Sequence, residues 1–222
     1  MKNIIILIIV CCTLMSNAPH KYSMLCLGDS YTIGEAVTED ARFPNQAIKM
    51  LGEKGIQFEN PKIIAKTGWT TDELADAIVQ EKLGGNKYDV VTLLIGVNNQ
   101  YRSRDKENYK QEFTALLHTA IGYAEKGKSH VFVVSIPDWG VTPFAEKDSR
   151  SAAELAKQID AFNAINKEVA AANGVHYIEI TKESRKAAKD AGLVAEDGLH
   201  PSAKMYQHWA ALLAKGIEGI LH

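Results

Sequence analysis

Ser30 stands where a nucleophile could be placed. It ends the segment Gly28-Asp29-Ser30, which directly follows the apolar run 24–27. In an open α/β sheet, the chain turns at the carboxyl end of a buried strand and can present a reactive side chain there. A serine hydroxyl attacks only when a base accepts its proton. Gly-Asp-Ser is also a common turn sequence, so this segment by itself leaves both interpretations open.

His200 and Asp197 could supply that base. They lie in Asp197-Gly198-Leu199-His200, close to the C-terminus. An imidazole titrates near neutrality, and a carboxylate three residues earlier could turn back to its second ring nitrogen. Pro201 is predicted to open the last helix, which would hold His200 at a helix N-terminus, where the dipole disfavours the imidazolium. Alternatively, the two residues are a loop aspartate and a helix-capping histidine.

Two further positions could stabilise an oxyanion. Asn98 follows the third apolar run, and strands one and three of a doubly wound sheet flank the crevice where the strand order reverses. Asn98 would then face Ser30 and donate an amide N–H to a developing negative charge. Gly68 follows the second run and precedes a helix, where a glycine lets a backbone N–H approach a ligand. Each of the two is equally compatible with an ordinary turn.

Five short apolar runs are expected to form the strands of one sheet. Two of them, 90–95 and 131–136, are mostly apolar without alternation. Strands that are buried on both faces have this pattern, so we predict a parallel sheet with helices on either side. The five predicted strands are 24–27, 62–65, 90–95, 131–136 and 176–180.

Segments with helical periodicity alternate with these strands. Thr70 and Glu73 have the spacing of a capping box at the start of one helix. Asn173-Gly174 is a typical helix stop. One expected helix begins at or near residue 70. The other three cover 108–126, 151–173 and 202–221.

The first 18 residues are typical of a secretory signal peptide. Lys2 precedes the apolar run 4–10, which is shorter than the roughly 20 residues of a membrane-spanning helix. We therefore expect cleavage near residue 18, a secreted or periplasmic location, and no membrane span in the mature chain. The bulky Val10 before Cys11 disfavours a lipoprotein signal, and an uncleaved anchor is the other alternative.

Residues 19–222 are expected to form one domain, since they contain no repeat, low-complexity segment or linker. Lys and Arg total 25 against 27 Asp and Glu, so no basic excess is available to bind nucleic acid. No His-Glu-x-x-His, Cys-x-x-Cys or glycine-rich phosphate loop occurs, so we expect neither a metal nor a cofactor. Cys26, the only cysteine after the leader, should be a small buried hydrophobe.

The order of these segments resembles that of the SGNH (GDSL-type) hydrolases, from about residue 22 to the C-terminus. The matching blocks are Leu27-Gly28-Asp29-Ser30-Tyr31, Gly68, Gly96-Val97-Asn98 and Asp197-Gly198-Leu199-His200-Pro201. The resemblance implies a flavodoxin-like three-layer α/β/α sandwich, a five-stranded parallel sheet in the order 2-1-3-4-5, and a serine esterase mechanism. The implied roles are Ser30 as nucleophile and first oxyanion donor, the Gly68 N–H and the Asn98 side chain as further donors, His200 as base and Asp197 as its partner.

The motifs do not determine the substrate pocket. Aromatic residues in loops at the predicted active edge could line an acyl or sugar pocket or pack in the core; they are Tyr31, Trp69, Tyr101, Trp139 and Phe144. The longest irregular stretch, 137–150, should lie at this edge. Arg102 and Arg104 could meet an anionic substrate group or face solvent. The family usually has aspartate where this chain has Asn99, which puts the internal hydrogen bonds of that loop in doubt.

These observations predict an exported serine esterase that hydrolyses carboxylic esters through an acyl-enzyme. Export fits a carbohydrate O-acetylesterase, whose substrate would be a glycan or small-molecule ester. A lysophospholipase or thioesterase-type acyl hydrolase fits the catalytic residues equally well. A catalytically silent carbohydrate-binding protein on the same fold is an alternative of another class. A phosphate or nucleotide binder would need the glycine-rich fingerprint that this chain lacks.

Overall fold

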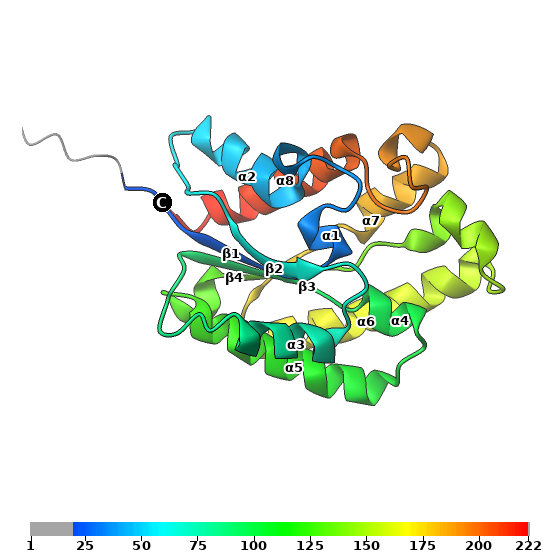
Figure 1. The fold of residues 1–222 in the computed structure, drawn as a ribbon, viewed down its shortest axis with the longest axis horizontal. Coiled ribbons are helices and arrows are strands. Elements are labelled where there is room, and N and C mark those ends of the chain that lie inside the picture. The colour runs from blue at the N-terminus through cyan, green and yellow to red at the C-terminus, as the bar shows by residue number, and fades with distance from the viewer. Residues whose placement is uncertain (1–19, 222) are drawn as a thin grey trace, which may run out of the picture.

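The five predicted strands form one parallel sheet in the order β2-β1-β3-β4-β5 (Figure 1). The computed structural model describes residues 20–221, so the predicted signal peptide lies outside the described residues. This is the flavodoxin-like order, in which β1 and β3 flank the point where the strand order reverses. The strands are β1 Met24–Asp29, β2 Lys62–Lys66, β3 Val90–Leu94, β4 Val131–Val134 and β5 His176–Ile178.

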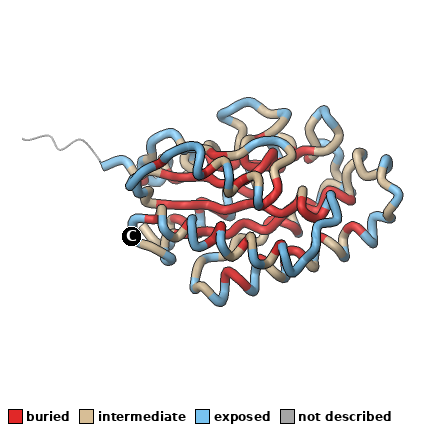
Figure 2. Tube along the Cα trace, turned by 60° about the horizontal axis from the view of Figure 1, so that its bottom comes forward, coloured by how far each residue is buried: buried red, intermediate tan, exposed pale blue. Residues whose placement is uncertain are grey.

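Burial of the central strands explains their unbroken apolar sequences. Every residue of β1, β3 and β4 is buried, whereas the edge strands β2 and β5 are partly exposed (Figure 2). Cys26 lies in the middle of β1, paired with Ile63 on one side and Thr92 on the other. Burial raises the pKa of its thiol to about 12, although a hydrogen bond with Thr92 opposes the shift. Cys26 is therefore the buried apolar residue that was predicted.

Helices cover both faces of the sheet and complete a three-layer α/β/α fold. Figure 1 shows α2 and α8 on one face and α3, α5 and α6 on the other. The predicted capping box of Thr70 and Glu73 opens α3, and α6 ends at a left-handed Gly174, as expected. None of the helices within residues 20–221 is long and apolar enough to cross a membrane. The α-helices are α1 Ser30–Ile33, α2 Phe43–Gly52, α3 Thr71–Gln80, α4 Val97–Tyr101, α5 Lys106–Tyr123, α6 Ala152–Asn173, α7 Thr181–Ser184 and α8 Ala203–Glu218.

The last helix begins later than predicted. Its first residue is Ala203, and the Ser202 hydroxyl caps it. Pro201 instead forms an antiparallel bridge with Val194, which keeps it extended and outside the helix. The prediction that Pro201 opens the helix is therefore wrong. His200 lies two residues before the Ser202 cap, so it is not itself the residue that caps the helix.

Two other segments differ from the prediction. The stretch 137–150 is not irregular throughout, since it contains the 3₁₀-helices η3 Trp139–Val141 and η4 Pro143–Lys147. Helix α2 has no counterpart among the predicted helices. Its signal is the four-residue spacing of Phe43, Ala47 and Leu51, which are all buried.

Candidate active site

The turn between β1 and α1 places Ser30 at the carboxyl edge of the sheet. Asp29 caps α1, and its Oδ1 accepts the Tyr31 N–H at 3.0 Å. Gly28 is required because a Cβ there would lie 2.1 Å from Thr32 Oγ1. Ser30 is the first residue of α1 and is 4% exposed. The first N–H groups of a helix have no intrahelical partner, so this position offers a backbone donor beside the hydroxyl.

Asp197 and His200 form a hydrogen-bonded pair. His200 Nδ1 lies 2.5 Å from Asp197 Oδ2, while Asp197 Oδ1 accepts the backbone N–H groups of Leu199 and His200 at 2.9 Å each. Partial burial opposes ionisation of Asp197, but these three hydrogen bonds outweigh it and lower the pKa of the carboxyl. An ionised carboxylate holds the imidazole proton on Nδ1, which leaves Nε2 as the proton acceptor.

One cleft brings four of the predicted site residues together. Ser30, Gly68, Asn98 and His200 all line a cavity of about 110 Å³. The first three follow β1, β2 and β3, and His200 precedes α8, so the sheet edge gathers them from distant parts of the chain. Among the described residues, no hydrogen bond joins Ser30 Oγ to His200. The remaining lining residues are mostly apolar: Tyr31, Thr67, Val97, Tyr101, Trp139, Phe144 and Leu199.

Gly68 and Asn98 bring N–H groups to the cleft. Gly68 has a φ of +87°, a conformation that favours glycine, and no described residue accepts a hydrogen bond from its N–H. Asn98 Nδ2 donates to the Trp69 carbonyl oxygen at 3.0 Å and lies 3.5 Å from Asp29 Oδ2. The second distance is beyond the usual range of a hydrogen bond, so one amide hydrogen is only loosely held.

Comparison with known proteins gives the family of this chain. The model of the GDSL-like lipase/acylhydrolase family matches residues 26–208. The chain belongs to the GDSL-like lipase/acylhydrolase family. Membership of this family makes the protein an ester-hydrolysing serine hydrolase. No curated protein matches its sequence.

Solved structures of similar proteins share the fold of this acylhydrolase along nearly all of their length. The structure of TesA is 17% identical with a TM-score of 0.68, covering 90% of this chain and 99% of that one. The lipase/acylhydrolase from Enterococcus faecalis is 21% identical with a TM-score of 0.66, covering 89% and 96%. The acetylxylan esterase Axe2 from Geobacillus stearothermophilus is 16% identical with a TM-score of 0.64, covering 88% and 94%. At these identities the likeness establishes the fold.

Asn99, the position that departs from the usual family sequence, joins α4 to the start of α3. Its Oδ1 accepts the Thr71 N–H at 3.2 Å, and its Nδ2 donates to Thr71 Oγ1 at 2.7 Å. The Thr71 hydroxyl gives its own proton to Glu112. Toward residue 99, the Thr71 oxygen can therefore act only as an acceptor. The asparagine Nδ2 donates to it, whereas an ionised aspartate has no proton to donate. In this acylhydrolase the hydrogen bonds of the loop are complete with asparagine.

Four of the five aromatic residues that were candidates for the substrate pocket line the cleft, namely Tyr31, Tyr101, Trp139 and Phe144. Tyr31 is 4% exposed, and its ring lies 5.1 Å from that of His200, so it also packs against the histidine. Tyr101 is 46% exposed and meets the buried ring of Trp139 edge-on at 5.4 Å. The side chain of Trp69 is not among the lining residues; its backbone carbonyl accepts the asparagine hydrogen bond described above.

Hydrogen bonds and a cation hold Trp139 in place as a wall of the cleft. Trp139 Nε1 donates to Gln100 Oε1 at 2.7 Å, and Gln100 Nε2 donates to Gln158 Oε1 at 2.7 Å. The Arg150 guanidinium lies 5.5 Å from the centre of the indole ring. Sequence reasoning missed Gln100, because a single glutamine in a short helix gives no periodic or motif signal.

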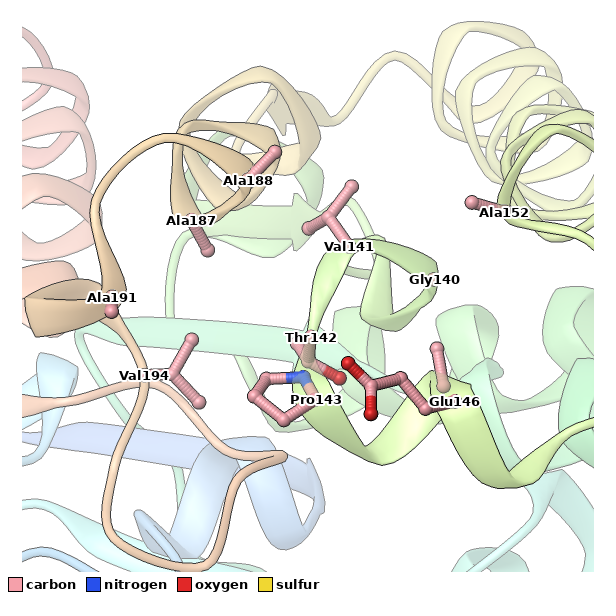
Figure 3. A pocket seen from close by; sticks show the side chains of 11 residues that line it. Gly140, Val141, Thr142, Pro143, Glu146, Ala152, Ala187, Ala188, Ala191 and Val194 are labelled. Carbon is pink, nitrogen blue, oxygen red and sulfur yellow. The ribbon is translucent and has the colours of Figure 1, made fainter.

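A larger groove elsewhere has a different character. It measures about 470 Å³ and is lined mainly by small apolar side chains of η3, η4 and the 187–194 segment (Figure 3). Glu146 is its only ionisable lining residue, and none of the predicted site residues reaches it. Within residues 20–221 there is also no cluster of His, Cys, Asp and Glu side chains that could hold a metal ion. The candidate chemistry therefore belongs to the smaller cleft.

Proposed function

We propose that this protein is an exported esterase that removes short acyl groups, acetyl in particular, from carbohydrates. The observation that supports it best is the hydrogen-bonded Asp197–His200 pair beside Ser30 in a small, mostly apolar cleft. Ser30, His200 and Asp197 carry the chemistry, and the size and walls of the cleft select the substrate class.

In this mechanism Ser30 is the nucleophile. As its Oγ attacks the carbonyl carbon of the ester, His200 Nε2 takes the hydroxyl proton, and Asp197 stabilises the imidazolium that forms. The carbonyl oxygen becomes an oxyanion and accepts hydrogen bonds from the N–H groups of Ser30 and Gly68 and from the Asn98 amide. His200 then returns the proton to the alcohol oxygen, the bond to the alcohol breaks, and an acyl-serine remains.

Water completes the reaction at the same groups. His200 Nε2 takes a proton from a water molecule as its oxygen attacks the acyl-serine carbonyl carbon. The oxyanion again accepts hydrogen bonds from the same three donors. His200 then protonates Ser30 Oγ as the acyl–oxygen bond breaks, which releases the carboxylic acid and restores the enzyme.

The size of the cleft favours a short acyl group. A cavity of about 110 Å³ is well below the roughly 300–1,000 Å³ of sites that enclose drug-sized ligands. Trp139 closes one side and is held rigidly, so the cleft has little room to lengthen there. Each buried methylene contributes about 0.8 kcal/mol where space exists, so a site that accepted long chains would show a steady gain with chain length. We expect no such gain here.

The open side of the cleft fits a sugar as the alcohol. Tyr101 exposes nearly half of its surface there and could stack on the apolar face of a pyranose ring. Axe2, which shares the fold, is named an acetylxylan esterase. A secreted or periplasmic location, proposed from the first 18 residues, would bring the enzyme to extracellular glycans.

A substrate panel tests the proposal. Purified wild type and Ser30→Ala are compared on p-nitrophenyl esters from acetyl to palmitoyl, acetylated xylo-oligosaccharides, lysophospholipid and an acyl thioester. Both proteins are also treated with a fluorophosphonate probe. We expect labelling and turnover of wild type only, with kcat/KM falling beyond butyryl and acetate released from the sugar.

Three other results would contradict the proposed acyl length, the catalytic activity or the export. Turnover of long acyl chains alone would indicate a lysophospholipase or thioesterase-type hydrolase. Glycan binding without labelling or turnover would indicate a silent binding protein. Export is tested separately, by cell fractionation and by the N-terminal mass of the purified protein. A cytoplasmic protein that keeps residues 1–18 would refute the export.

A further inference from the structure

We propose that Arg102 positions the Gly68 N–H for the oxyanion, an inference that rests on the proposed function. Arg102 directly follows α4, and its Nη2 donates to the Gly68 carbonyl oxygen at 2.6 Å. Its Nη1 lies 3.4 Å from each carboxylate oxygen of Glu73, in the first turn of α3. A single guanidinium thus joins α4 to the 67–70 loop and to the helix that follows it.

The 67–70 loop is fixed on both sides of Gly68. The Thr67 hydroxyl donates to Glu35, and the Trp69 carbonyl accepts from Asn98. Between these anchors, Arg102 is the only described side chain that bonds the Gly68 backbone. Glycine has the greatest backbone freedom of all residues, so its orientation depends on such contacts. Arg102 holds the Gly68–Trp69 peptide unit, whereas the Gly68 N–H belongs to the preceding Thr67–Gly68 unit. Without Arg102, rotation about the φ and ψ bonds of Gly68 is less restrained, so the Gly68 N–H could turn away from the cleft.

Arg102 also links the Gly68 loop to the helix that carries Asn98, another of the three oxyanion donors. Asn98 and Arg102 are one helical turn apart, and the Arg102 N–H donates to the Asn98 carbonyl at 3.0 Å. Both side chains bond carbonyl groups of consecutive loop residues, Gly68 and Trp69. These two bonds fix the Gly68–Trp69 segment of the loop relative to α4 and its Asn98 side chain. A misplacement of about 1 Å at a catalytic group can lower a rate about 10²-fold.

Positioning of Gly68 accounts for the contacts of Arg102 better than binding of a substrate anion does. Its guanidinium already has a carbonyl and a carboxylate as partners. The Arg102 side chain is 40% exposed, so its ion pair with Glu73 should contribute little to folding stability. Arg104, two residues later, pairs with Asp72 at 3.7 Å and is similarly exposed, but no hydrogen bond joins it to the loop backbone. Arg104 is therefore a matched control.

The test compares Arg102→Met, Arg102→Lys and Arg104→Met with wild type. For Arg102→Met we expect kcat on p-nitrophenyl acetate to fall about 10- to 100-fold with KM within about twofold. The rate of fluorophosphonate inactivation should fall by a similar factor, because that reaction uses the same oxyanion donors. Arg102→Lys should recover part of kcat, since an ammonium can still donate to the Gly68 carbonyl. Arg104→Met should match wild type.

Amide hydrogen exchange gives a readout that does not depend on activity. The Trp69 N–H bonds the Lys66 carbonyl, and the Thr70 N–H bonds Glu73. Both should exchange faster in Arg102→Met and not in Arg104→Met. Unchanged kcat and exchange in Arg102→Met, or an equal loss in Arg104→Met, would overturn the inference. If wild type hydrolyses no ester, the proposed function fails, while the exchange data still show whether Arg102 orders the loop.

Discussion

Replacement of Asp29 by asparagine should remove a large part of the pH dependence of stability. Asp29, the last residue of β1, is completely buried, and burial raises the pKa of its carboxyl from 3.8 to about 7, against the hydrogen bond from the Tyr31 N–H. Between pH 3.8 and about pH 7, Asp29 of the folded protein binds a proton that Asp29 of the unfolded chain has lost. This contribution to the free energy of unfolding is complete below pH 3.8 and is lost as the pH rises through about 7.

The size of the effect follows from the same two values. The difference between 3.8 and about 7 corresponds to about 4 kcal/mol. Asparagine is neutral at every pH, and its carbonyl oxygen can still accept the Tyr31 N–H. Relative to wild type, Asp29→Asn should therefore gain several kcal/mol in free energy of unfolding between pH 4 and pH 8.

Equilibrium unfolding in urea at a series of pH values measures this difference. Asp76→Asn, an exposed position on α3, is the matched control and should follow the wild-type curve. All other titrating groups are common to wild type and variant, so their contributions cancel in the comparison. Parallel curves for wild type and Asp29→Asn would refute the reasoning, because they would show that Asp29 does not bind a proton preferentially in the folded state.

Three further substitutions test the site and its scaffold. Asp197→Asn should lower kcat roughly 10²- to 10⁴-fold with little change in KM, measured on p-nitrophenyl acetate, because the carboxylate orients the base; near-normal turnover would contradict this. Asn98→Ala should lower kcat roughly 10²- to 10³-fold, and the same assay would expose an intact rate. Gly28→Ala should destabilise the fold by roughly 1–3 kcal/mol or more in urea unfolding, because its Cβ would lie 2.1 Å from Thr32 Oγ1 and 2.4 Å from the Leu94 carbonyl; an unchanged midpoint would contradict that clash.

Sequence reasoning worked best where the signal was local. The capping box at Thr70 and the stop at Gly174 depend on neighbouring residues, and both occur as predicted. The unbroken apolar runs identified the buried central strands for the same reason. The predicted start of the last helix was wrong because a bridge between Pro201 and Val194, seven residues apart, competed with local helix propensity.

The sequence also pointed to Ser30, Gly68, Asn98 and His200 without showing how they meet. Their types and order indicated nucleophilic ester chemistry, but only the parallel sheet brings them into one cleft. The sequence neighbours of Asn99 could not show whether it completes the hydrogen bonds of its loop, because its partner Thr71 is 28 residues away.

The sequence alone determined which chemical groups this acylhydrolase possesses and which segments form its buried strands, while the strand order was implied by the family resemblance. Turn chemistry, capping and burial of strands depend on residues that are close in the chain, so their signals are legible in it. The tertiary structure alone decided the narrowness of the cleft, the clamp on Trp139 and the contact of Arg102 with the Gly68 carbonyl. The hydrogen bond from Arg102 to Gly68 joins residues 34 positions apart, and that from Trp139 to Gln100 joins residues 39 positions apart, so no local pattern encodes them.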